Sequence, residues 1–128
     1  MPAAARWTVT VAAFFALLLA RRPETILRAE FAFEDGKVWY LGAWHLPLFE
    51  AIATPYAGYL HLIPRVVGYF ERQGSVSMAP LVGNMVALVV VALIAAYVSS
   101  DRLSRVIPSR HVRLIAALYT SSCSRRPG

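Results

Sequence analysis

The chain has 128 residues, of which 58% are hydrophobic and only 16% are charged. Soluble domains carry about a quarter charged residues, so this composition argues against an ordinary soluble enzyme. The formal net charge is +6, but twelve of the thirteen cations are arginines, and these flank apolar runs. That placement is typical of contact with lipid headgroups and argues against nucleic acid as a partner. Cys123 is the single cysteine, which excludes an intrachain disulfide and a CxxC metal site.

A first apolar run, WTVTVAAFFALLLA, occupies residues 7–20. With its flanks, about residues 5–22, it reaches the roughly 20 residues that a tilted helix needs to cross a bilayer. The length would also suit a signal peptide, but Leu18 would occupy position −3 of a cleavage site after Ala20, where cleavage requires a small side chain. We therefore expect an uncleaved transmembrane anchor.

A second apolar run, residues 78–98, contains no formal charge over its 21 residues. At about 1.5 Å per residue it spans roughly 31 Å, close to the thickness of a bilayer core. Pro80 would fall in the first helical turn, where its missing N–H costs little. Asn84 is the strongly polar side chain inside this run, and we expect it to hydrogen-bond a neighbouring helix.

Arginines predict the orientation. The short segment 99–113 carries four arginines against Asp101 alone, which favours the cytoplasmic side. Two crossings then place the N-terminus in the cytoplasm and the loop 23–77 outside. Arg21 and Arg22 argue for the opposite orientation, but long loops translocate despite such charges, and arginines at helix ends can extend to the interface.

The last segment, 114–128, starts with six apolar residues at 114–119 and ends in SSCSRRPG. Six apolar residues cannot cross a bilayer, so we expect a truncated third apolar segment.

The outer loop contains ten aromatic residues, a class that favours the headgroup level of a membrane. We expect short amphipathic helices on the membrane surface, over 37–44, over 46–52 with a break at Pro47, and over 57–72 with a kink or a division at Pro64. The predicted fold is an all-α membrane protein, forming a single membrane module. Two transmembrane helices are joined by an outer loop of interfacial helices.

An acidic pair, Glu34 and Asp35, stands just before Gly36 in this loop. One interpretation is a turn, in which Gly36 takes a left-handed conformation. The other interpretation is a carboxylate site that accepts a proton or holds a divalent cation. His61 and Arg65, four residues apart, would share one helical face, and an arginine fork suits a phosphate. Structural roles for these two, as a local cap and as a headgroup anchor, stay open.

Three segments together resemble a known family. RAEFAFEDGKVWYLGAW (28–44), TPYAGYLHLIPRVVGYF (54–70) and APLVGNMVALVV (79–90) are similar to the N-terminal module of GT-C glycosyltransferases from a largely uncharacterised bacterial group. The resemblance implies a bacterial plasma-membrane protein that takes a sugar from a polyprenyl-phosphate donor on the outer face.

The resemblance also implies residue roles. Glu34 or Asp35 would be the catalytic carboxylate, Asp35 would be the ligand of any Mg or Mn ion, and His61 and Arg65 would lie near the donor phosphate. GT-C enzymes have many more spans, so we expect an inactive fragment of such an enzyme. The alternative is a small two-span structural or interaction subunit, whose Asn84, Gly83 and Ala87 pack on a partner helix.

Overall fold

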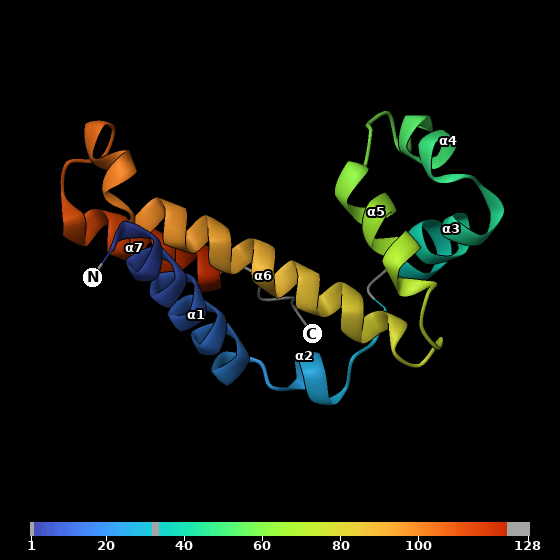
Figure 1. The fold of residues 1–128 in the computed structure, drawn as a ribbon, viewed down its shortest axis with the longest axis horizontal. Coiled ribbons are helices and arrows are strands. Elements are labelled where there is room, and N and C mark those ends of the chain that lie inside the picture. Colours follow the sequence, from blue (N-terminus) through green and yellow to red (C-terminus); the bar gives the residue numbers. More distant parts are fainter. Residues whose placement is uncertain (1, 32–33, 123–128) are drawn as a thin grey trace. The chain divides into compact units, whose positions relative to one another are not determined.

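The structure is a computed structural model that describes residues 2–31 and 34–122. Its elements, most of which are labelled in Figure 1, follow one another in this order: α1 (Ala3–Arg21), α2 (Glu24–Leu27), η1 (Asp35–Tyr40), α3 (Leu41–His45), α4 (Leu48–Ala53), α5 (Leu62–Glu71), α6 (Ala79–Ser99), η2 (Asp101–Arg105) and α7 (Arg110–Ser122). The chain divides into two compact units, which we describe separately. Unit 1 comprises Met1–Pro23 and Ala87–Gly128, and unit 2 comprises Glu24–Val86.

Two helices are long and apolar enough to cross a membrane. Ala4–Arg21 has a mean hydropathy of 1.4, and Ala79–Ser99 has a mean hydropathy of 2.5. The predicted all-helical class and the two predicted apolar helices are therefore confirmed for the described residues, in which no strand is formed. Pro80 occupies the first turn of α6, as expected, where no backbone hydrogen bond is lost.

Unit 1 is held together by an alanine-rich core. Phe14 and Leu18 of α1 pack with α6, and Ala117 of α7 joins the same cluster. The α6 members of this core are Leu88, Ala92, Ala95 and Ala96. Small side chains allow helix backbones to approach closely, which is how apolar helices associate in lipid. Figure 1 accordingly shows α1 and α7 running beside the second half of α6.

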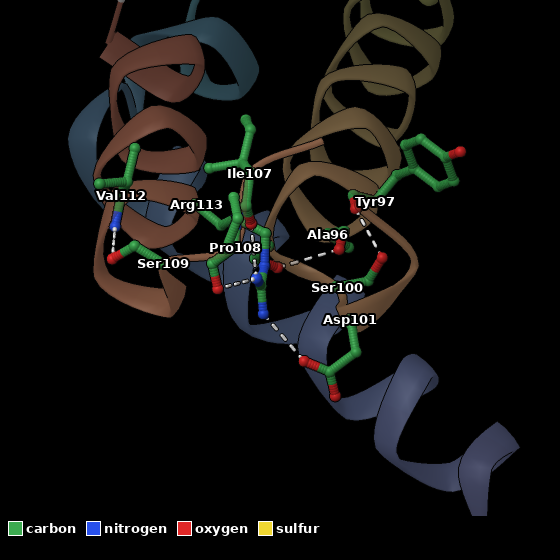
Figure 2. A network of polar contacts seen from close by, with 10 residues as sticks. Ala96, Tyr97, Ser100, Asp101, Ile107, Pro108, Ser109, Val112 and Arg113 are labelled. Atoms are coloured by element: carbon green, nitrogen blue, oxygen red, sulfur yellow. Dashed lines mark hydrogen bonds and ion pairs between the residues drawn. The ribbon is translucent and has the colours of Figure 1, made fainter. Parts of the chain in front are cut away.

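A buried arginine, Arg113, stabilises the turn between α6 and α7. The Arg113 guanidinium donates hydrogen bonds to the backbone carbonyls of Ile107 and Pro108, at 2.8 and 3.1 Å, and to the Asp101 carboxylate at 2.9 Å. Figure 2 shows these contacts around the end of α6. One of the arginines used to predict orientation is therefore also a structural clamp. Residues 114–122 of the predicted stub belong to α7, whereas 123–128 lie outside the described residues.

The short helices of unit 2 agree with the sequence in one part and differ in another. Helical structure runs from η1 through α3, and α4 follows after Pro47, so the predicted pieces and their break are confirmed. The predicted helix over 57–72 is wrong in its first five residues, because α5 begins only at Leu62. Pro64 lies in the first turn of α5, where its missing N–H costs no helical hydrogen bond, so the predicted division of the helix at Pro64 is wrong.

A tight turn accounts for the late start of α5. Tyr56 and Tyr59 exchange two backbone hydrogen bonds, at 2.9 and 3.1 Å. The two residues between them, Ala57 and Gly58, have φ values of 51° and 86°. This pair of left-handed residues is the geometry of a type I′ turn, which a right-handed helix cannot contain.

The turn interpretation of the acidic pair is also wrong. Glu34 has helical dihedrals, with φ −76° and ψ −12°, and Asp35 opens the π-helical segment η1. Gly36 has no left-handed conformation. Its small size is needed instead, because a Cβ there would lie 3.2 Å from the Phe31 ring. The pair is thus held at the start of a helix.

Candidate functional site

Helix α5 turns its charged residues inward. Arg65, Gly68 and Glu71 are its buried residues, and their spacing of three places them along one side of the helix. Gly68 allows this side to approach η1 closely, because a Cβ at Gly68 would lie 2.5 Å from the Trp39 carbonyl oxygen. The Tyr69 hydroxyl donates to the Leu46 carbonyl and ties α5 to the end of α3. The candidate site is therefore built between α5 and η1.

Arg65 lies against Trp39. Its side chain is only 5% exposed, and its Cζ atom is 5.0 Å from the centroid of the Trp39 ring. One terminal nitrogen, Nη2, donates to the Thr54 carbonyl across a long 3.4 Å. The buried Nε finds no hydrogen-bond partner among the described residues. Since buried donors are usually paired, this Nε is an unsatisfied group in the interior of unit 2.

His61 contacts the same tryptophan. The two rings stack at 4.9 Å with an interplanar angle of 28°, and Tyr56 meets the imidazole edge-on at 5.9 Å. The Nδ1 atom lies 3.0 Å from the Tyr59 carbonyl oxygen, which can only accept. Nδ1 therefore carries the proton of this hydrogen bond, and in the neutral ring Nε2 is the acceptor.

A second carboxylate accompanies Asp35. Glu71 is 3% exposed, and burial, reinforced by the charge of Asp35, raises its pKa from 4.5 to about 7. Its Oε1 atom occupies the space where Gly83 of α6 would carry a side chain. An acidic group with such a pKa exchanges its proton near neutral pH, a property required of general acids and bases.

The predicted site residues differ in their exposure and in their contacts. Glu34 is exposed, whereas Asp35 is partly buried and electrostatically coupled to Glu71. His61 and Arg65 both contact Trp39, but they do not share a helical face as predicted, because α5 begins after His61. Sequence reasoning missed Glu71, which it counted only as one charge of the loop. Glu71 could have been identified from its spacing of six residues from Arg65, which places both on the side of α5 away from Ile63 and Phe70.

The residues do not form a metal centre on their own. In the described part of the chain, no three His, Cys, Asp or Glu side chains are grouped so that they could hold a metal ion. Asp35 and Glu71 form only a pair. Mg²⁺ is often bound by one or two carboxylates that share it with substrate phosphates, so a cation here would depend on a bound phosphate for its remaining ligands.

Asn84 and Gly83 have partners within unit 2. The Asn84 amide nitrogen donates to the Thr25 carbonyl of α2 at 2.9 Å, so the predicted hydrogen bond to a neighbouring helix is confirmed. Gly83 receives Glu71, as described above. Asn84 and Gly83, which were expected to pack on a partner protein, thus contact residues of this chain instead.

The site combines three chemical features: aromatic rings, an arginine with an uncommitted donor and a carboxyl group that titrates near neutral pH. Rings of this kind stack on sugar or base faces, and the guanidinium suits phosphate oxygens. No protein-family model, curated protein or solved structure matches this chain.

Proposed function

We propose that this chain is an integral membrane protein that binds the phosphate of a lipid-linked sugar through unit 2. The observation that carries the proposal is the inward side of α5, where Arg65 keeps an unpaired Nε beside Trp39. The helices on either side of unit 2 in the sequence are apolar enough to span a membrane. A polyprenyl-phosphate sugar, the donor implied by the resemblance to GT-C transferases, has the lipid, phosphate and sugar parts that these features suit.

Each residue has a role in this proposal. Arg65 binds the phosphate, and Nε2 of His61 accepts a hydrogen bond from a donor-sugar hydroxyl, which the stacked Trp39 ring helps to position. In an intact GT-C enzyme that contained this segment, Asp35 would take the place of the loop carboxylate and accept the proton of the acceptor hydroxyl. Glu34 is a weaker candidate for that role because it is exposed. No step is assigned to a metal ion.

The proposal includes a location. The chain lies in a bacterial plasma membrane with its N-terminus in the cytoplasm, so that unit 2 faces the outer side, where polyprenyl-phosphate sugars are used. Positive charge in the segment 99–113 supports this orientation, even though Arg113 is also a structural clamp.

Binding of a polyprenyl monophosphate to the full chain in lipid nanodiscs tests the proposal. Arg65→Gln should weaken binding about tenfold or more, because a hydrogen bond to a charged group contributes roughly 1.5–3 kcal/mol. Arg28→Gln is the matched control, since it removes the same charge from an exposed position of unit 2 and should leave affinity unchanged. Circular dichroism verifies that both variants are folded.

Two outcomes would reject phosphate binding at this site. One is a wild-type chain that does not bind the lipid phosphate above the level of empty nanodiscs. The other is an equal loss of affinity in Arg65→Gln and Arg28→Gln, which would assign binding to net charge alone. Both outcomes would favour the structural-subunit alternative, for which Ala87, exposed on α6, remains an available packing position.

A further inference from the structure

Helix α5 is amphipathic, but its charged side faces the protein interior and its apolar side is exposed. Its charged residues Arg65 and Glu71 point inward, whereas its apolar residues are left uncovered: Ile63 is 57% exposed and Phe70 is 66% exposed. A helix on the surface of a soluble domain has the opposite arrangement, with apolar residues toward the core. The uncovered side of α5 therefore requires an apolar environment outside this chain.

The uncovered surface continues into the preceding turn. Tyr59 and Leu60 are exposed there, and Leu62 follows them at the start of α5. We call the set Tyr59, Leu60, Leu62, Ile63 and Phe70 the outward apolar face. His61, in the middle of this run, is excluded from the face because its ring stacks on Trp39.

The second half of α5 lies beside the start of α6. Glu71 and Val67, one turn apart on α5, both reach Gly83 of α6. Gly83 is four residues from the start of α6 at Ala79, a distance of roughly 6 Å along the helix at about 1.5 Å per residue. The 21 residues of α6 are only just enough to cross a bilayer core. If α6 spans the membrane, the second half of α5, which carries Phe70, therefore lies at the level of the bilayer surface.

We infer that the outward apolar face is seated in the lipid bilayer, at the boundary between headgroups and acyl chains, while the opposite side of α5 holds Arg65 and Glu71 within the protein. Lipid is the occupant because the contacts of Val67 and Glu71 with Gly83 place the second half of α5 beside the first turns of α6. Tyr59 supports the assignment, since tyrosine favours this boundary. The inference rests on the proposed membrane insertion of α6, and it goes beyond phosphate binding by stating which surface contacts lipid.

Site-specific fluorescence tests the inference in the full chain. In a Cys123→Ser background, Ile63→Cys is labelled with an environment-sensitive fluorophore and the protein is reconstituted in phosphatidylcholine vesicles. The label should show a blue-shifted emission, and lipids that carry a nitroxide near the carbonyl end of the acyl chain should quench it. Glu50→Cys, at an exposed polar position of the same unit, should be quenched several-fold less. Phe70→Cys provides a second position on the face.

A label at Ile94, an exposed position within α6, tests the membrane insertion of α6 separately from the lipid contact of α5. If lipid nitroxides fail to quench the Ile94→Cys label, membrane insertion fails, and the inference fails with it. If that label is quenched but labels at Ile63 and Phe70 are in water, the lipid contact is refuted while insertion stands. Blue-shifted emission at Ile63 without lipid quenching would show that a protein surface covers the face, which also overturns the inference.

Discussion

The two units of this chain bury different kinds of residue. Unit 1 packs alanines of α6 against α1 and α7, so its core consists of small apolar side chains. Unit 2 buries Arg65 and Glu71 and leaves large apolar side chains such as Phe49 and Phe70 outside. Unit 1 also buries a charged side chain, Arg113, which lies at the turn after α6 and outside the alanine core. The same overall composition thus yields an apolar helical core in one unit and, in the other, charged residues on the inward side of a helix.

This difference separates the structural and chemical parts of the molecule. A close-packed alanine core supplies rigidity and no reactive group. Buried charges are costly and persist where neighbouring groups compensate for the loss of water. In unit 2 the compensation is incomplete, because Arg65 retains an unpaired Nε and Glu71 is coupled to a second carboxylate, Asp35. Arg113 in unit 1 also has a buried Nε without a partner among the described residues, but its guanidinium makes three hydrogen bonds, one of them to Asp101. We place function in unit 2 because a buried arginine and a buried titrating carboxyl group lie there on one helix.

The largest expected effect concerns the buried carboxyl group. Because Glu71 has a pKa of about 7 in the folded chain and 4.5 as its ordinary value, the folded state retains the proton more strongly than the unfolded state. Stability is therefore at its maximum below about pH 4.5, falls as the pH rises to about 7, and is level above that. Glu71→Gln mimics the protonated group and should abolish this decrease, a gain on the order of 3 kcal/mol at pH 8.

Denaturant unfolding monitored by tryptophan fluorescence, in a Trp7→Phe background that leaves Trp39 and Trp44 as reporters in unit 2, measures this effect. Glu50→Gln changes an exposed glutamate of the same unit and should retain the wild-type pH dependence. Identical pH dependence in Glu71→Gln and wild type would show that unit 2 does not bury a titrating carboxyl group.

An intermediate effect is expected in the alanine core of unit 1. Ala92 is fully buried, so Ala92→Leu should overpack the contact between helices and lower the free energy of unfolding by about 1–3 kcal/mol. Ala87→Leu makes the same change at an exposed position of α6 and should be nearly neutral. Unfolding in mixed micelles with increasing SDS, followed by circular dichroism, compares the two variants. Equal stability would mean that α1 and α7 do not pack closely on Ala92.

The smallest effect is expected in the turn of unit 2. Ala57 has a left-handed conformation, which costs an L-residue roughly 1–2 kcal/mol and costs glycine much less. After the larger chain entropy of glycine is subtracted, Ala57→Gly should stabilise unit 2 by about 0.5–1 kcal/mol. Ala53→Gly, at the end of α4, should instead destabilise it, because the backbone is helical there. A loss of stability in Ala57→Gly would indicate that the turn is not type I′.

Local sequence patterns predicted the helices well and the inward residues incompletely. Apolar length predicted α1 and α6, and Pro47 predicted a break between short helices, because these features depend on adjacent residues. The start of α5 was predicted five residues too early, since Ala57 gives no sign of the left-handed backbone that it adopts. The Asp-Gly turn was predicted wrongly because glycine at 36 is selected by the nearby Phe31 ring, a contact that the sequence pattern does not reveal.

The sequence by itself determined the helical class and the two apolar helices, because each follows from the pattern along one chain segment. The helical face predicted for His61 and Arg65 is absent, since α5 begins after His61, and the tertiary contact of both side chains with Trp39 brings them together. Only the tertiary structure decided that Glu71, rather than Glu34, accompanies Asp35. Burial depends on what packs against a helix, and the packing of α5 between η1 and Gly83 brings together residues that are distant in sequence. That packing also decides which side of α5 lies inside and leaves its apolar side facing outward.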